Sequence, residues 1–84
     1  MDSEYKNILV HNIDKIHTTE LGYKRISNNL KINDFNIKYI IDKILDQNSI
    51  IYKKGKNFYV EIDNIKITIN SYNYCVITAH RHML

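Results

Sequence analysis

The chain has 84 residues, of which 44% are hydrophobic and 25% are charged, and its formal net charge is +3. This length and composition predict one folded domain over residues 1–84. No apolar run reaches the ~18 residues of a membrane-spanning helix, and the first residues lack the features of a signal peptide, so we expect a cytoplasmic protein without a membrane partner. Cys75 is the only cysteine, so no internal disulfide is expected.

The excess of positive charge is mild. Lys and Arg total 12, and only Arg25 and Arg81 are arginines. Abundant Lys, Ile and Asn without any Pro is typical of an AT-rich genome, which accounts for much of the lysine. The net charge therefore permits a polyanionic partner without requiring one.

The first half of the chain, about residues 3–47, shows helical periodicity. Apolar residues at helical spacing predict a first helix over 3–16. A second helix is predicted to begin after Thr18 or Thr19, either of which can serve as its N-cap, and to end at Leu30.

A third helix, predicted over 35–46, has the clearest amphipathic pattern in the chain. Asn33 or Asp34 is the predicted N-cap of this helix. Because its apolar stripe is broad, we expect Ile41 or Ile44 to be fully buried against the rest of the fold.

From about residue 49 to 81 the apolar period changes from 3.6 to 2, which indicates strands. Strands are predicted over 49–53, 58–62, 65–70 and 74–80, with turns at 54–57, 63–64 and 71–73. Consecutive hairpins of this kind form an antiparallel meander, and its apolar face can be covered only by the helices. The predicted fold class is α+β, with two to three N-terminal helices packed on one face of a four-stranded antiparallel meander.

Alternation also assigns the two faces of the strands. The side chains predicted to face the helices are Phe58, Val60, Ile62, Ile65, Ile67, Ile69, Cys75, Ile77 and Ala79. Those predicted to face outward are Tyr59, Glu61, Lys66, Thr68, Asn70, Tyr74, Val76, Thr78 and His80. Such an aromatic, hydroxyl-bearing and basic face is a plausible nucleic-acid platform, although Thr and Tyr are also common in solvated strands. The predicted partner-binding residues are Tyr59, Lys66, Thr68, Arg81, Lys54 and Lys56.

Two clusters contain histidine and arginine. His17 precedes the second helix, where backbone N–H groups can hold an anion, and Arg25 follows within that helix. Residues 78–82 contain Thr78, His80 and Arg81, which could supply an acid or base and a phosphate clamp. The alternatives are that His17 merely ends the first helix and that residues 78–82 form an exposed basic tail.

Several other kinds of site are not indicated. The histidines lack enough neighbouring ligands for zinc, so no metal site is predicted. Gly22 and Gly55 are the only glycines, so the chain has no phosphate-binding glycine loop, and no cofactor is predicted.

Three separated motifs carry a family resemblance: IHTTELG at 16–22 followed by Arg25, KGKNFY at 54–59, and ITAH at 77–80. Together they resemble an uncharacterised family of small bacterial proteins, mainly from clostridia and relatives, known as a domain of unknown function. This resemblance covers nearly the whole chain and implies no established activity.

The order of helices and strands, with Thr78 and His80 on the last strand, is also similar to barnase-like and messenger-RNA-interferase ribonuclease toxins. That similarity implies a metal-independent ribonuclease or RNA-binding domain, in which Thr78 and His80 match the site by position on the last strand and His17 and Arg25 match by lying in the helical region. For such a mechanism we assign proton transfer to His80 and His17, phosphate binding to Arg25 and Arg81, and stacking or positioning to Tyr59. The alternative is a non-enzymatic inhibitor module, encoded by a phage or mobile element, that binds a nucleic-acid-binding protein. Whether the protein is an enzyme stays open, and an exposed strand edge permits a homodimer.

Overall fold

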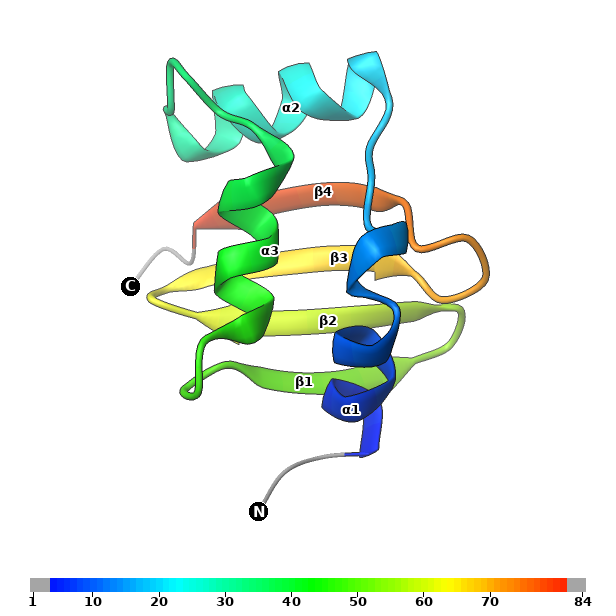
Figure 1. Ribbon diagram of the computed structural model, residues 1–84. Helices are drawn as coiled ribbons and strands as arrows, with labels where there is room; N and C mark the ends of the chain where they lie inside the picture. The colour runs from blue at the N-terminus through cyan, green and yellow to red at the C-terminus, as the bar shows by residue number, and fades with distance from the viewer. Residues whose placement is uncertain (1–3, 82–84) are drawn as a thin grey trace.

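The computed structural model describes residues 4–81, in which three α-helices precede four strands (Figure 1). The strands pair antiparallel in chain order, β1-β2-β3-β4. The α+β fold class and the N-terminal position of the helices are confirmed. The elements are α1 (Glu4–His11), a 3-10 turn η1 (Ile13–Lys15), α2 (Glu20–Leu30), α3 (Ile37–Leu45), β1 (Ile50–Lys54), β2 (Asn57–Ile62), β3 (Ile65–Asn70) and β4 (Val76–Arg81).

The helices cover one face of the sheet and one of its edges. In Figure 1, α1 and α3 cross in front of the sheet, and α2 runs alongside β4. No helix in the described part of the chain is long and apolar enough to cross a membrane. The core lies between the helical side and the sheet. On the helical side it contains Leu9, Ile26, Leu30, Ile40 and Ile44, with Phe35 from the α2–α3 connection, and on the sheet it contains Ile51, Phe58, Val60, Ile67, Ile69 and Ala79.

The first helix is shorter than predicted. It ends at His11, where the Asn12 side chain donates from Nδ2 to the Ile8 carbonyl at 2.8 Å and competes with helical pairing. After η1 the chain is extended, and His17 forms a parallel bridge with Cys75. The prediction of one continuous helix to residue 16 is wrong. Residues 13–15 form the separate turn η1, and the backbone is extended only from Ile16, where the chain approaches its pairing with Cys75.

The start of α2 depends on three neighbouring residues. Thr19 is the N-cap, as predicted, and its Oγ1 accepts from the Gly22 N–H at 3.0 Å. Thr18 instead donates from Oγ1 to the Val76 carbonyl at 2.8 Å, which fastens the helix start to β4. A Cβ on Gly22 would lie 2.3 Å from Thr18 Oγ1 and 3.4 Å from the Val76 oxygen, so this close approach requires glycine.

The third helix begins later than predicted. Its N-cap is Asn36, with no side-chain capping bond, so the prediction of Asn33 or Asp34 as the cap is wrong. The reason is Phe35, which is extended into the core as a buried ring with edge contacts to Tyr23 and Tyr39. Burial of this aromatic ring outweighs the preference of short polar residues for the cap position. Ile44 is fully buried as expected, whereas Ile41 is half-buried.

The hairpin turn at Asp63 and Asn64 is confirmed, with positive φ at both residues (53° and 63°). The face assignment of β4 is only partly right. Thr78 pairs with Thr68 and Val76 pairs with Ile69, so Ile77 is an extra residue in a bulge. The bulge turns Val76 inward, to 1% exposure, and leaves Ile77 37% exposed, opposite to prediction.

The last turn also differs from prediction. Tyr74 has a positive φ of 61° and its ring stacks on the buried Phe58, so it packs against the core rather than facing outward. Cys75 is partly exposed and precedes β4, which starts two residues later than predicted.

Ile44→Ala should lower the free energy of unfolding by about 2–5 kcal/mol, because it empties a fully buried position between α3 and the sheet. Leu45→Ala is the matched control on the next position of the same helix, where the side chain is 48% exposed, and it should change stability far less. Urea denaturation measures both. Equal destabilisation by the two variants would contradict the described packing of α3.

Gly22→Ala should destabilise the protein, although alanine normally favours a helix by about 1 kcal/mol over glycine. The reason is the collision of the new methyl group with Thr18 Oγ1. In a Thr18→Ala background the same change should cost less, because the obstructing oxygen is gone. Thermal unfolding of the parent, the two single variants and the double variant gives the coupling free energy between positions 18 and 22. If the effects of the two changes on stability simply add, the two residues do not touch.

Candidate functional site

The face of the sheet opposite the helices is the candidate site, and we call it the outer face. Its residues follow from strand register, because cross-strand partners share a face. No helix within residues 4–81 covers it, and in Figure 1 it faces away from the viewer. Its three rows are Ile50–Glu61–Lys66–His80, Tyr52–Tyr59–Thr68–Thr78, and Lys54–Asn57–Asn70.

A pair of stacked tyrosines lies in the middle row. Tyr52 and Tyr59 are cross-strand partners, with ring centroids 5.4 Å apart and an interplanar angle of 23°. The Nζ atom of Lys66 lies 4.9 Å from the Tyr59 ring centroid. A cation at this distance is attracted to the ring and holds it in place. The outer face therefore presents an ordered aromatic pair beside a positive charge.

Glu61 is the one carboxylate in the three rows, and it is engaged. Its Oε2 accepts a hydrogen bond from the Tyr52 hydroxyl at 2.5 Å. This hydrogen bond, followed by desolvation and the charge of Glu61, raises the pKa of Tyr52 to about 12. His80 is exposed on the same row, beside its register partner Lys66. The carboxylate thus orients a tyrosine of the aromatic pair.

The predicted hydroxyl residues occupy the β4 side of the face. Thr68 is only 9% exposed, so its hydroxyl offers little surface to a ligand. Thr78 Oγ1 accepts from Asn29 Nδ2 of α2 at 3.2 Å. Arg25 is exposed one turn before Asn29, on the same side of α2. The structure therefore brings Arg25 to the rim of the outer face near Thr78.

The structure does not bring His17 and His80 together. The backbone of His17 pairs with Cys75 and Val76 at the start of β4, through a 2.7 Å bond from the Val76 N–H to the His17 carbonyl. His80 lies five residues beyond Cys75, which corresponds to roughly 16 Å along a strand. His17 also donates from Nδ1 to the Lys15 carbonyl at 2.8 Å.

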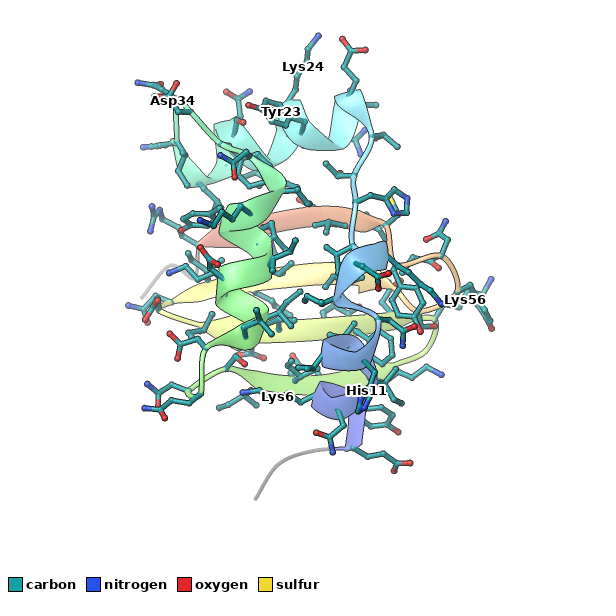
Figure 2. The ribbon with its side chains drawn as sticks, in the orientation of Figure 1. Lys6, His11, Tyr23, Lys24, Asp34 and Lys56 are labelled. Carbon is teal, nitrogen blue, oxygen red and sulfur yellow. The ribbon has the colours of Figure 1, made fainter. Side chains whose placement is uncertain are left out.

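The remaining predicted residues have different surroundings. Arg81 donates from Nη2 to the Leu30 carbonyl at 3.1 Å, which satisfies a terminal carbonyl of α2. Lys54 and Lys56 are exposed in the β1–β2 hairpin, and Lys56 is labelled in Figure 2 at the tip of that hairpin. Residue 82 of the C-terminal cluster lies outside the described residues.

Sequence reasoning missed two residues that contact predicted site residues, Tyr52 beside Tyr59 and Asn29 beside Thr78. Tyr52 was missed because the alternation was not extended to the first strand, where buried Ile51 would have placed Tyr52 outward. Asn29 carries no sequence signal, since its contact with Thr78 spans 49 positions. Within residues 4–81, no group of three or more His, Cys, Asp or Glu side chains is placed to hold a metal ion.

Fold and site together define a small α+β protein with helices on one face of a meander and an aromatic, basic opposite face. The model of the family described as protein of unknown function (DUF3781) matches residues 10–80. The chain belongs to this family. No curated protein and no solved structure gives a significant match.

The raised pKa of Tyr52 gives a testable pH dependence. Folding favours the protonated phenol, so this stabilisation is complete below pH 10 and is lost as the pH rises from about 10 to about 12. Tyrosinate absorbance should show a late-titrating group that disappears in Tyr52→Phe. Glu61→Gln should lower the pKa of Tyr52 by removing the charged acceptor. A late step that persists in Tyr52→Phe would assign it to another residue.

Proposed function

We propose that the protein binds single-stranded RNA on its outer face. The observation that carries the proposal is the stacked pair Tyr52–Tyr59, held beside the Lys66 ammonium on a sheet face that the described helices leave open. Unpaired bases stack on aromatic side chains of exactly such sheets, and neighbouring lysines bind the phosphates. Single strands are favoured over duplexes because only unpaired bases offer their faces for stacking.

The charges of the outer face support a polyanionic ligand. Lys54 and Lys66 belong to its rows, and Arg25 stands at the β4 rim. The negative charge of Glu61 is offset locally by the Tyr52 hydroxyl that donates to it and by Lys66, its register partner. A strand lying across the aromatic pair would therefore meet positive charge on both sides.

The geometry supports binding better than the cleavage mechanism with His17 and His80. Proton transfer requires both groups within hydrogen-bond reach of the same phosphodiester, about 3 Å. The two histidines lie at opposite ends of β4, so one ribose-phosphate unit cannot contact both. His80 and Arg25, in contrast, both border the outer face and are placed to contribute to binding.

One observation favours a protein partner as a second candidate. β1 is an edge strand with no described neighbour beyond it, and its first residue, Ile50, is 66% exposed. An exposed apolar side chain on an edge strand is a contact point for another protein chain.

Binding of a fluorescent oligouridine, followed by anisotropy, tests the proposal. Tyr59→Leu keeps the apolar bulk of the side chain and removes its ring, so affinity should fall by roughly 5- to 150-fold, the equivalent of about 1–3 kcal/mol for one stacked base. The RNA should stay intact with EDTA present. If the parent protein does not bind at low salt, the proposal fails and the protein-partner candidate takes its place.

Lys66→Gln, tested against Lys38→Gln, separates site-specific from general charge effects. Both changes remove one positive charge, but Lys38 is exposed on α3, on the helical side of the sheet. Lys66→Gln should weaken binding and flatten its salt dependence, whereas Lys38→Gln should leave both nearly unchanged. Equal effects of the two variants would place the RNA elsewhere.

A further inference from the structure

A second exposed surface lies at the end of the sheet where β1 meets β2 and β3 meets β4, and we call it the hairpin end. The two connections are joined by a 2.9 Å hydrogen bond from the Ser71 N–H to the Lys56 carbonyl. The β3–β4 connection carries Tyr72, which is 78% exposed, more than any other large hydrophobic side chain in the described part of the chain. The outer face does not include this residue.

The loop that carries Tyr72 is ordered by asparagines. Asn70 Oδ1 accepts from the Tyr72 N–H at 2.8 Å and from the Asn73 N–H at 3.2 Å. Asn73 Oδ1 accepts from the Cys75 N–H at 2.9 Å. These bonds fix the backbone on both sides of an exposed ring. A ligand that stacks on Tyr72 would therefore need to order little beyond the ring itself.

The charge of the hairpin end complements a phosphate backbone. Three lysines lie at the end of β1 and in the β1–β2 connection: Lys53, Lys54 and Lys56. Residues 47–60 and 64–81, which include both connections of the hairpin end, contain no acidic residue. Glu4 and Asp14 belong to α1 and η1, on the helical side of the sheet.

The other end of the sheet carries charges of both signs. Asp63 lies in the β2–β3 hairpin and forms an ion pair with Lys43, and Asp46 lies in the connection that leads into β1. Lys66 and Arg81 also lie toward that end, so positive and negative charges are mixed there. The connections of the hairpin end and the strand ends beside them carry lysines without acidic residues, so a polyanion is attracted to the hairpin end.

We propose that the hairpin end extends the RNA site, with Tyr72 stacking on a base and Lys54 and Lys56 binding phosphates of the same strand. This inference rests on the proposed function. Lys54 is on the outer face itself, and Lys56 is three residues from Tyr59, or roughly 10 Å along a strand. A single strand that stacks on Tyr59 thus passes the two lysines before it reaches Tyr72. The ligand class is an oligonucleotide several residues long, not a mono- or dinucleotide.

The test compares a uridine dinucleotide with an oligouridine of about eight residues, a length within the usual range of ~4–16 for single-strand sites. Tyr72→Ala should weaken binding of the longer ligand by roughly 5- to 150-fold and leave the dinucleotide unaffected. The double variant Lys54→Gln/Lys56→Gln should reduce the slope of log affinity against log salt by about 1.4, because each phosphate contact contributes about 0.7.

Lys24→Gln/Lys38→Gln is the matched control, with the same change in net charge on α2 and α3; Figure 2 shows Lys24 far from Lys56. The inference is overturned if Lys54→Gln/Lys56→Gln has the same salt slope as this control, or if Tyr72→Ala binds the longer ligand as tightly as the parent. In either case, weaker binding by Tyr59→Leu would still support the outer face as the RNA site. If the parent binds neither ligand, the proposed function itself fails. Thermal unfolding checks that the variants fold alike. The changes at Tyr72 and at the lysines should leave it unchanged, because these side chains are exposed.

Discussion

The pairing of the segment around His17 with the start of β4 determines how the rest of the molecule is arranged. The His17 carbonyl accepts from Val76, and the Thr18 hydroxyl donates back to the Val76 carbonyl. These two bonds fix the first turn of α2 against the strand, and the missing side chain of Gly22 allows the contact. Since α2 is anchored at one end here and at the other by Arg81, it lies parallel to β4 along its whole length.

This placement has a direct effect on the opposite face of the sheet. α2 closes the edge of β4, while α1 and α3 provide the apolar surface that the inner side chains require. The outer face is left without a hydrophobic partner among the described elements. Its tyrosines are instead ordered by each other, by Glu61 and by Lys66. This ordered aromatic pair in contact with solvent is the basis for proposing a binding role.

The features that follow from local sequence were predictable, and those that depend on distant contacts were not. The change in apolar period distinguished helices from strands, and the backbone preferences of Thr19 and of Asp63–Asn64 located a cap and a turn. The extended backbone at His17 could not be foreseen, because its pairing partner is 58 positions away. The bulge at Ile77 inverted two side chains for the same reason: alternation predicts faces only while the register is regular.

In the candidate site, too, the strand positions could be predicted from local sequence and the distant contacts could not. Alternation placed Tyr59, Lys66 and His80 on one face correctly, since all three belong to strands or stretches with regular register. It gave no information on how far His17 lies from His80, on the contact of Asn29 with Thr78, or on the engagement of Arg81 with the end of α2. These relations depend on where α2 packs, and no local pattern encodes that position.

The unequal edges of the sheet limit how the protein can assemble. β4 is covered by α2, whereas β1 has no described neighbour on its outer side. A fibre built by strand addition needs two free edges on every copy, one to accept and one to donate. With the β4 edge covered, any strand addition would be confined to the β1 edge and would end after two copies. The same contact that anchors α2 therefore protects the protein against open-ended polymerisation.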